Sequence, residues 1–478
     1  MYIGLDLGTS SLKAILVDED QCILAEHAVP LSVSRPQDGW SEQDPSQWFA
    51  ATDVAMRALG VQADLSAVRG IGLAGHMHGA TLLDKADNAL RPCILWNDTR
   101  SADEAHALDS DPQFRNVSGN IVFAGFTAPK VVWVKNNEPE IFAKLAKALL
   151  PKDYLRLLLI GDHIAEMSDA AGTSWLDVAK RDWSDELLSA SYLDRTHMPR
   201  LVEGSESSGI LLDTLAQNWG LPKGVVVAGG GGDNAASAIG AGVVSKGDAF
   251  VSLGTSGVLF AASDAYQPDA ASAVHTFCHA LPDTWHQMGV ILAATDALQW
   301  LSRLTGQSAA DLTRDLGPLQ APSRTLFLPY LGGERTPHNN PSMRGQFLHL
   351  DQATDAREAA RAVVEGVTFA FADCHEALRS TGTVIERALA LGGGAKSDYW
   401  LSAIATTLNL PLMLPQAGDF GAALGAARLG MMAACGAGTE IATLPPIEKT
   451  IQPQSALSNA FQDTHARYRA AYSALKDL

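Results

Sequence analysis

The stretch YIGLDLGTSSLK, residues 2–13, reads as a strand, a tight Gly-Thr-Ser turn and a second strand. A second copy of this pattern, FVSLGTSGVLF, occupies residues 250–260, about half the chain length further on. In both copies apolar residues flank the turn, as expected for two buried strands joined in a hairpin. Two such hairpins, half a chain apart, predict two domains of like fold.

The turns themselves indicate a ligand. Gly8 and Thr9 form the first turn, and Gly254, Thr255 and Ser256 form the second. A turn of this kind offers backbone N–H groups and hydroxyls to an anion, and its glycine lets a phosphate approach the main chain. We therefore expect two domains that close on a nucleoside triphosphate.

The two hairpins differ at one position of chemical interest, where the first has Asp6 and the second has Ser252. A carboxylate beside a polyphosphate is repelled unless a divalent cation lies between them. Asp6 is therefore predicted to bind Mg²⁺, through a water molecule. An aspartate that accepts hydrogen bonds from turn amides is the alternative, and the sequence leaves both open.

The composition sets limits on the class of protein. The 478 residues are 47% hydrophobic and 18% charged, which predicts two or three globular domains. A net charge of −18 argues against nucleic acid or an anionic membrane as a partner. The five cysteines are scattered without metal-ligand spacing, so we expect reduced thiols and a cytoplasmic protein. We expect neither a signal peptide nor a membrane span.

Predicted strands and helices alternate along the chain, which favours an α/β class. Apolar spacing predicts a helix over residues 45–59, and glycine-rich turns link strand to helix near residues 229–232 and 392–394. The segments 232–241 and 418–426 are similar helices of alanine and glycine, which would allow a close crossing at a hinge. Ordinary buried helices packed on a sheet are the alternative.

Together, these hairpins, helices and the turn at residues 392–395 resemble the actin-like, or ribonuclease H-like, ATPase superfamily. Within it, the segment GFTAPKVVWVKNN, residues 125–137, is similar to the first signature of the FGGY carbohydrate kinases. Residues 345–365 meet the second signature in part, with His349 and Ala359 departing from it. The resemblance implies two actin-like domains, residues 1–242 and 243–478, with a cleft and a hinge between them.

The resemblance also implies roles for particular residues on the sugar side. Asp233 matches the catalytic aspartate, a base that would also contact the sugar, and Met77 and His78 match a pair that contacts a ketose. Histidine can bond a sugar oxygen, and methionine supplies an adaptable apolar wall. The alternative for Asp233 is a helix N-cap, since Asp419 has the same Gly-Asp setting before a helix. For His78 it is a turn histidine without a ligand.

The segment with Trp96, Asn97 and Asp98 is a further candidate for the sugar pocket, because an aromatic face with polar neighbours suits a carbohydrate. A position in the core is the alternative for Trp96. On the nucleotide side, the resemblance assigns Lys13 to the first phosphate turn, with a solvated strand charge as the alternative. It assigns adenosine to the side-chain-free turn formed by Gly392, Gly393, Gly394 and Ala395.

The segments 75–84, 94–98, 150–156 and 331–340 are similar to the members of the family that act on D-xylulose. This implies transfer of a phosphoryl group from ATP, with Mg²⁺, to that small sugar; a homodimer would be an inference from relatives. Rival interpretations are kinases of ribulose, another ketose, glycerol or gluconate. A non-catalytic actin-like nucleotide switch is a rival of another class. A Rossmann dehydrogenase is disfavoured because the run at residues 229–232 lacks the required glycine spacing.

Overall fold

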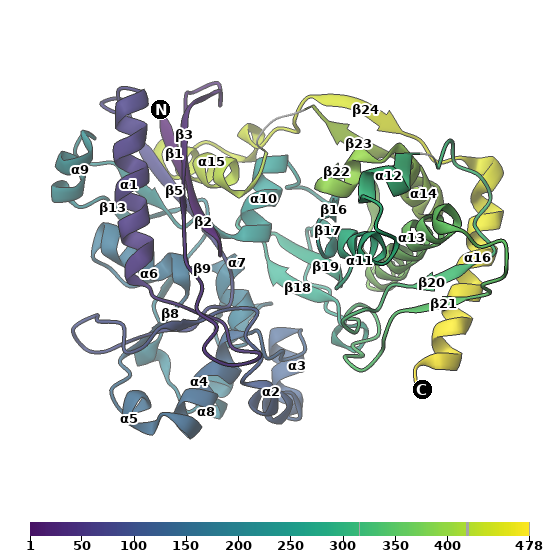
Figure 1. Cartoon of the computed structure of the whole chain (residues 1–478). Helices are drawn as coiled ribbons and strands as arrows, with labels where there is room; N and C mark the ends of the chain where they lie inside the picture. The colour runs from purple at the N-terminus through teal and green to yellow at the C-terminus, as the bar shows by residue number, and fades with distance from the viewer. Residues whose placement is uncertain (315, 417–419, 478) are drawn as a thin grey trace.

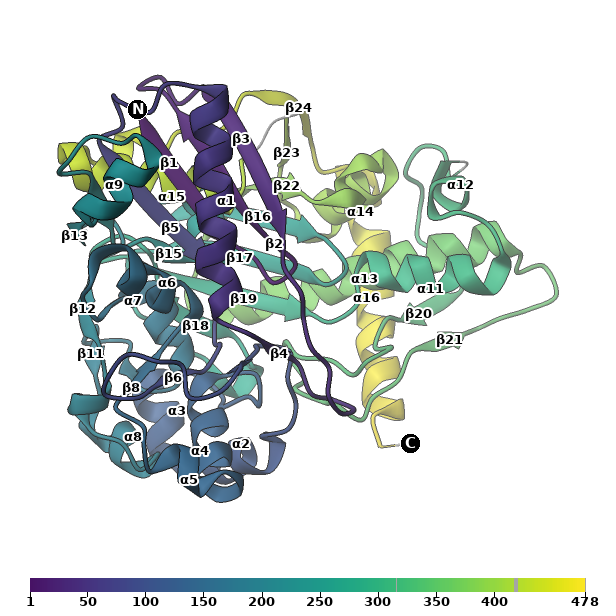
Figure 2. The same ribbon diagram turned by 60° about the vertical axis from the view of Figure 1, so that its left-hand side comes forward.

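A computed structural model describes residues 1–314, 316–416 and 420–477 of the chain. Asp419, which the sequence offered as a comparison for Asp233, lies outside these described residues. The chain forms two lobes, each built around one mixed sheet (Figures 1 and 2). We call the lobe with the N-terminal sheet the first lobe and the other the second lobe.

The first sheet grows from the N-terminal hairpin. Its central strand β1 pairs antiparallel with β2 and parallel with β5, so the hairpin predicted over residues 2–13 is confirmed. The sheet runs in the order β13-β14-β5-β1-β2-β3, with β15 added beside β5. These strands are β1 (Tyr2–Leu7), β2 (Ser11–Val17), β3 (Ile23–Pro30), β5 (Gly70–Gly75), β13 (Ser207–Ile210), β14 (Val226–Ala228) and β15 (Gly231–Gly232).

The second sheet repeats this plan. Its strand β16 pairs antiparallel with β17 and parallel with β22, as β1 does with β2 and β5, so the predicted duplication is confirmed. The order is β18-β19-β17-β16-β22-β23-β24. These strands are β16 (Gly247–Leu253), β17 (Gly257–Ser263), β18 (His275–Cys278), β19 (Trp285–Ile291), β22 (Ile385–Leu391), β23 (Leu412–Pro415) and β24 (Ile447–Ile451).

Helices pack on these sheets, and short strands lie in the loops that connect the main elements. The helix predicted over residues 45–59 is α1, Ser46–Gln62, and it buries the apolar face that defined it. The other helices are α2 (Ala102–Asp109), α3 (Pro112–Ser118), α4 (Thr127–Asn137), α5 (Pro139–Phe142), α6 (Pro151–Ile160), α7 (Met167–Ala170), α8 (Asp185–Ala190), α9 (Asp213–Trp219), α10 (Asp233–Ala241), α11 (Thr295–Thr305), α12 (Ala309–Arg314), α13 (Ala356–Ser380), α14 (Asp398–Leu408), α15 (Ala422–Cys435) and α16 (Ser455–Leu475). The short strands are β4 (Glu42–Gln43), β6 (Thr81–Leu83), β7 (Cys93–Ile94), β8 (Lys147–Leu149), β9 (Ile164–Glu166), β10 (Leu176–Asp177), β11 (Asp182–Trp183), β12 (Arg200–Val202), β20 (Leu326–Leu328) and β21 (Gln346–Leu348).

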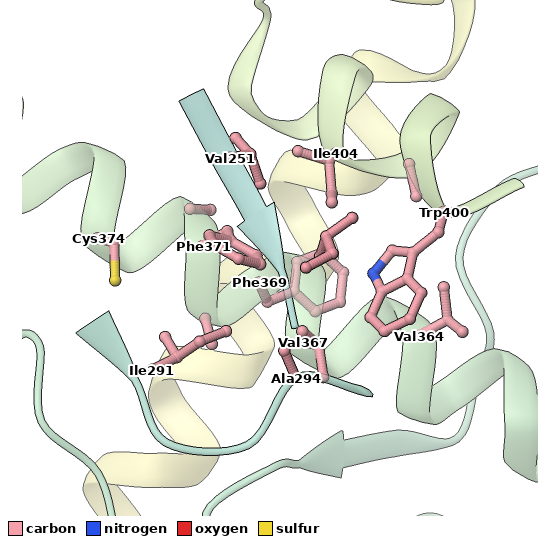
Figure 3. Close-up of a cluster of buried hydrophobic side chains, with 14 of the residues drawn as sticks. Val251, Ile291, Ala294, Val364, Val367, Phe369, Phe371, Cys374, Trp400 and Ile404 are labelled. Atoms are coloured by element: carbon pink, nitrogen blue, oxygen red, sulfur yellow. The ribbon is translucent and has the colours of Figure 1, made fainter. Parts of the chain in front are cut away.

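The core of the second lobe is aromatic and aliphatic (Figure 3). Phe369 and Phe371 of α13 lie among Val251 of β16, Ile404 of α14 and Trp400, all of them buried. Burial of such side chains contributes about 1.5–3 kcal/mol each. This packing fixes the sheet from which the second Gly-Thr-Ser turn projects.

Helix α15 belongs to the last quarter of the chain but packs on the first sheet (Figures 1 and 2). The approach is so close that a Cβ atom at Gly4 would lie 1.9 Å from the oxygen of Ala423, and one at Gly72 would lie 1.8 Å from that of Ala426. Glycines in β1 and β5 therefore create the groove that receives the helix backbone. The first lobe is completed by a segment from the far end of the sequence.

Helix α10 meets α15 in the crossing that the alanine and glycine pattern predicted. A Cβ atom at Gly425 would lie 1.7 Å from the oxygen of Ala236, so only glycine fits there. In turn, Ala238 of α10 is buried in one cluster with Phe250 and Phe260 of the second sheet. The two lobes thus meet through a pair of small-residue helices. The domain boundary between residues 242 and 243 stays a prediction. Helix α15 follows this boundary in the sequence but packs on the sheet that precedes it.

Within the described residues no helix is long and apolar enough to cross a membrane.

Candidate active site

The carboxyl edge of the first sheet gathers residues that the sequence assigned to the sugar and to Mg²⁺. Asp6 is the last but one residue of β1, Met77 and His78 follow β5, and Asp233 follows β15. Asp6 and Gly231 both lie opposite Ala74, on the two sides of β5, so their backbones are about 10 Å apart from strand spacing alone. Ligands of α/β sheets bind at this edge.

Asp233 is the first residue of α10, and Gly232 holds the N-cap position without a side-chain cap. The carboxylate accepts hydrogen bonds from the backbone N (2.7 Å) and the side-chain Nδ2 (2.9 Å) of Asn234, not from the N–H groups that an N-cap serves. The N-cap interpretation therefore does not describe Asp233. Burial raises the pKa of its carboxyl to about 6, against the opposing effect of the bonds from Asn234.

Met77 and His78 both lie against Gly172, and Met77 also contacts the turn before Asp233. Met77 packs on Gly232, where a Cβ atom would lie 2.9 Å from the methionine Sδ. His78 Nδ1 lies 2.7 Å from the oxygen of Gly172, an acceptor, so Nδ1 carries the proton. Burial, then the nearby Lys130, lowers the pKa of His78 to about 3, and the ring is neutral. Its Nε2 is consequently an acceptor for a hydroxyl.

Lys130 stabilises the backbone of His78 by a hydrogen bond, a role that the sequence did not predict. His78 has a left-handed backbone with φ of 68°, which costs a residue with a Cβ atom about 1 kcal/mol or more. The buried Lys130 Nζ donates to the oxygen of His78 (2.8 Å) and to that of Gly125 (2.7 Å), and Thr127 Oγ1 also donates to His78. Burial lowers the pKa of Lys130 to about 7. Its place in the first family signature was the available signal.

Aromatic rings from both lobes surround His78. Phe126 stacks on the imidazole with 4.5 Å between ring centroids. From β18 of the second lobe, Phe277 lies 6.2 Å from His78, and His275 lies 5.9 Å from Phe126. The surroundings of His78 are therefore formed by both lobes. No periodicity in the sequence pointed to these residues, since their proximity is created by tertiary packing.

Trp96 lies beside the first phosphate turn. Its indole Nε1 donates to Thr9 Oγ1 at 3.1 Å, and the side chain is 49% exposed. The core alternative for Trp96 is therefore wrong. Its neighbour Asn97 is half-buried, and within the described residues its Oδ1 has no hydrogen-bond partner. An acceptor of this kind is compatible with a ligand nearby.

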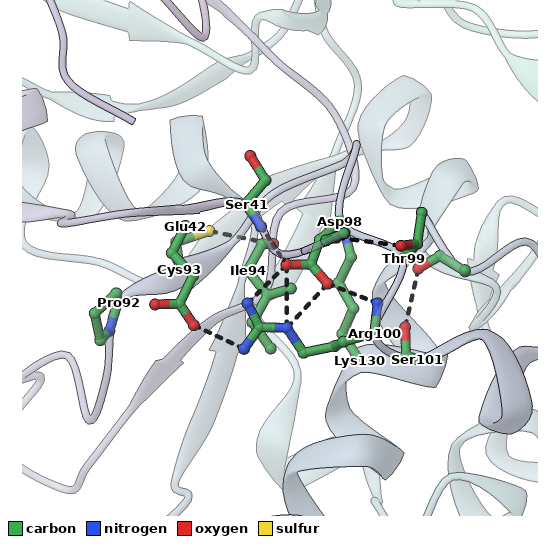
Figure 4. Close-up of polar contacts among 12 residues, drawn as sticks. Ser41, Glu42, Pro92, Cys93, Ile94, Asp98, Thr99, Arg100, Ser101 and Lys130 are labelled. Atoms are coloured by element: carbon green, nitrogen blue, oxygen red, sulfur yellow. Dashed lines mark hydrogen bonds and ion pairs between the residues drawn. The ribbon is translucent and has the colours of Figure 1, made fainter. Parts of the chain in front are cut away.

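Asp98, by contrast, is engaged within the protein (Figure 4). It is fully buried, accepts a bond from the backbone N of Ser41 at 2.6 Å, and forms an ion pair with Arg100 at 2.7 Å. The Arg100 guanidinium lies 3.5 Å over the ring of Trp40. The Oδ1 of Asp98 accepts from the backbone N and Nε of Arg100, both at 2.9 Å, so both oxygens of Asp98 are used within the protein and the structure gives this residue a structural role.

The first phosphate turn differs in detail from expectation. The N–H of Gly8 donates to the oxygen of Ser11 at 3.0 Å, so it closes the turn and does not point to a phosphate. Lys13 forms an ion pair with Glu26 on β3 at 2.9 Å, with both side chains partly exposed. That contact explains Lys13 without a phosphate. Thr9, whose oxygen accepts from Gln43, remains the ligand candidate of this turn.

The second phosphate turn and the adenosine turn lie side by side. The oxygen of Gly254 accepts from both N and Oγ1 of Thr295, which fixes the turn to the start of α11. Gly392 has φ of 87°, and a Cβ atom there would lie 2.7 Å from the oxygen of Leu253. A Cβ atom at Gly393 would meet only open space. The turns at residues 254–256 and 392–395 thus form one surface at the carboxyl edge of the second sheet.

A cavity of about 570 Å³ opens beside this surface. It lies between the start of α10 and the second sheet, within the usual size of a small-molecule site. Its lining includes Asn234, Ser237, Ser252, Gly392, Ala395 and Lys396. Because Asn234 follows Asp233, the candidate base lies at the join between this cavity and the residues around His78.

A buried charge network stands behind the Asp233 turn. Lys152 Nζ lies 2.8 Å from Asp153, 3.2 Å from Glu166 and 3.0 Å from Asp169, and all four side chains are fully buried. Burial raises the pKa of Asp169 to about 8. Glu166 accepts from Ser168 Oγ, which in turn accepts from the N–H of Gly232 at 3.0 Å. The network therefore fixes the backbone immediately before Asp233.

Two sheets of one topology, joined by crossing helices and facing a shared site, define the actin-like fold. Comparison with known proteins agrees. The chain matches the N-terminal domain of the FGGY family of carbohydrate kinases over residues 1–240 and its C-terminal domain over residues 249–434. The chain belongs to the FGGY family of carbohydrate kinases.

Particular relatives are similar over the full length. The chain is 49% identical to the xylulose kinase of Escherichia coli (strain K12), covering 100% of both chains, and 35% identical to that of Bacillus subtilis (strain 168), covering 100% and 99%. It is also similar to the crystal structure of a xyloylose kinase from Brucella ovis, with 57% identity, a TM-score of 0.98 and 99% of each chain covered.

Proposed function

We propose that this protein transfers the γ-phosphoryl group of ATP to D-xylulose, giving D-xylulose 5-phosphate and ADP. One observation carries the proposal: Met77, His78 and Asp233 meet at one sheet edge, beside a cavity that borders the turn at residues 392–395. The relatives of this length bear the name xylulose kinase, and the 75–84 segment is similar to theirs.

Asp233 is the base in this proposal. Its carboxylate accepts the proton of the attacking hydroxyl, and the two bonds from Asn234 hold it in one orientation. A pKa of about 6 keeps it ionised at neutral pH but still able to bind a proton as the transition state forms. Since phosphoryl transfer has a loose transition state, positioning and charge stabilisation supply the rest.

The sugar is oriented by neighbouring groups of fixed state. The neutral His78 accepts a hydrogen bond at Nε2, because Nδ1 donates to Gly172. Met77 forms an apolar wall against Gly232. A site that bonds specific hydroxyls rejects analogues that lack them far more strongly than an apolar pocket does.

The nucleotide lies on the other side of α10 in this proposal. The turn at residues 254–256, together with Thr9, would bind the phosphates, and the glycines at 392–394 would leave room for adenosine. Asp6 would hold Mg²⁺ through water. Among the described residues no group of three or more ligating side chains is positioned to bind a metal. The donor set thus fits a cation that is coordinated mainly by phosphate and water, whose charge would neutralise the transferred group.

We also infer a cytoplasmic enzyme and a homodimer. The first is supported by the five free cysteines, of which Cys93, Cys278 and Cys374 are buried. The second is an extension from related kinases, and sedimentation of the purified protein would test it.

The test is ADP release from MgATP with D-xylulose, D- and L-ribulose, other ketoses, glycerol and gluconate. We expect selective stimulation by D-xylulose and loss of that stimulation in Asp233→Asn. Stimulation by a different polyol would contradict D-xylulose as the substrate but would still support a kinase. ATP turnover that none of these sugars stimulates would support a nucleotide switch instead.

A further inference from the structure

We propose that Arg335 is a sugar-binding residue that the second lobe contributes to the pocket around His78. This inference rests on the proposed function, because it concerns the same sugar. Arg335 lies in the connection between β20 and β21 of the second lobe. Arg335 has no role in the site or the reaction described above.

The position of Arg335 places it across from the sugar residues of the first lobe. Its guanidinium carbon lies 4.1 Å from the ring centroid of Phe123, which belongs to the loop before α4. The Phe123 ring lies 5.3 Å from His275 and 5.5 Å from Phe126, which stacks on His78, and the charge of Arg335 helps to lower the pKa of both imidazoles. The side chain therefore reaches from one lobe to the residues that line the pocket in the other.

The Arg335 side chain is half-buried but has no carboxylate partner. Over the described ranges of the chain, its guanidinium forms no ion pair and no hydrogen bond, and its contact is with the ring of Phe123. The adjacent Glu334 does not serve, because its Oε1 accepts from the backbone N–H groups of Leu292 and Arg335. Burial accordingly lowers the pKa of Arg335 to about 10.

A half-buried guanidinium without an anionic partner has free N–H donors for a ligand that supplies acceptors. Arginine presents five N–H donors in a rigid fork and no acceptor, so its ligand must supply oxygen acceptors. The hydroxyl and carbonyl oxygens of a ketose are such acceptors. His78 Nε2 on the opposite side is an acceptor, so the two residues are complementary: one receives a hydroxyl proton and the other donates to oxygen.

The loop that carries Arg335 is held in place before any ligand arrives. Thr336 donates from N to Val290 and from Oγ1 to Ala273, and His338 stacks on Tyr472 of α16 with 3.6 Å between centroids. Preorganisation of this kind reduces the entropy lost on binding. Because Arg335 and His78 belong to different lobes, sugar that contacts both favours the closed arrangement.

The experiment is calorimetric titration of Arg335→Gln with D-xylulose in the absence of nucleotide, and steady-state kinetics of the same variant. We expect sugar affinity to fall at least ~10-fold, as for loss of hydrogen bonds to a charged group. KM for the sugar should rise in parallel, with KM for MgATP within about 2-fold of wild type. Arg303→Gln, an exposed arginine of α11 in the same lobe, is the matched control and should bind normally.

The Arg335→Lys variant distinguishes a loss of sugar binding from a loss of folding. Lysine keeps the positive charge but not the rigid set of guanidinium N–H donors. We expect its sugar affinity to lie between those of wild type and Arg335→Gln. Wild-type sugar affinity in Arg335→Gln would overturn the inference, as would a loss confined to MgATP, which would make Arg335 a phosphate ligand. If wild type binds another polyol instead of D-xylulose, the proposed substrate fails, and the same variants titrated with that polyol still decide the role of Arg335.

Discussion

Among the described residues, Asn234 is the one neighbour whose hydrogen bonds offset the burial of the Asp233 carboxyl. Replacing Asp233 with asparagine retains an oxygen that can accept from the backbone of Asn234, so the fold should persist. We expect kcat to fall by about 10²–10⁴-fold, the usual contribution of a general base. Rapid-mixing or steady-state assays measure this; a variant with wild-type kcat would remove Asp233 from the mechanism.

The raised pKa of Asp233 also predicts two pH effects. A base must be deprotonated, so kcat/KM should fall about tenfold for each pH unit below about 6. The contribution of this carboxyl to folding stability has the opposite dependence on pH. Because the folded pKa exceeds the model-peptide value, the carboxyl favours the folded state at low pH, and this contribution is lost as pH rises through about 6. Asp233→Asn should therefore raise Tm at pH 8 but not at pH 4; equal shifts at both values would contradict the assignment.

Lys152 permits a sharper test of the network behind Asp233. Lys152→Met would leave Asp153, Glu166 and Asp169 buried without their shared cation, and we expect a loss of about 3–5 kcal/mol in the free energy of unfolding. The control is Lys223→Met, which breaks an exposed pair with Asp213 and should cost less than about 1 kcal/mol. Denaturant titration compares the two, and similar losses would refute a special role for the network.

At this scale the sequence allowed prediction of residues that belong to a local pattern. Met77, His78 and Asp233 follow glycine-bounded strand ends, and the structure brings them together. Asp98 and Lys13 were also proposed from local context, yet their partners Arg100 and Glu26 explain them. Lys130 and Arg335 were missed as functional candidates, because their importance depends on which distant groups they face after folding.

Among the elements, the crossing of α10 and α15 is the most sensitive to substitution. Gly425→Ala would place a methyl group 1.7 Å from the oxygen of Ala236, which forces the helices apart. Overpacking of this kind costs about 1–3 kcal/mol, and it would also displace the start of α10, so activity should fall with stability. Thermal unfolding and kcat of the variant measure both effects.

Gly60→Ala is the appropriate control for that substitution. Gly60 lies within α1, and a Cβ atom there would make only an ordinary contact of 3.6 Å with Leu65. Alanine in a helix interior should stabilise it by about 0.5–1 kcal/mol. If both alanine variants behaved alike, the close approach of the two helices would not be the cause.

The hairpins, α1 and both glycine-rich turns could be predicted because each is encoded by contiguous residues. The packing of α15 on the first sheet could not, since the glycines at positions 4 and 72 give no indication of which helix they receive. The alanine and glycine pattern predicted a close crossing with α10. It did not predict that α15 would complete the sheet of the other lobe.

For the whole molecule, this arrangement predicts that the two halves depend on each other. A fragment of residues 1–242 lacks α15, so one face of its sheet would be exposed. We expect this fragment to aggregate when expressed alone and to become folded when residues 243–478 are co-expressed. A cooperative thermal transition of the isolated fragment would show that α15 is dispensable.

The order in which the chain leaves the ribosome determines when helix α15 can pack on the first sheet. Most multidomain proteins can complete their N-terminal domain while the remainder is still being translated. Here the groove of Gly4 and Gly72 receives Ala423 and Ala426, which are made only after the whole N-terminal half and most of the second sheet. The N-terminal half therefore stays incomplete throughout its own synthesis, and the carboxyl edge of its sheet becomes final only after α15 has emerged.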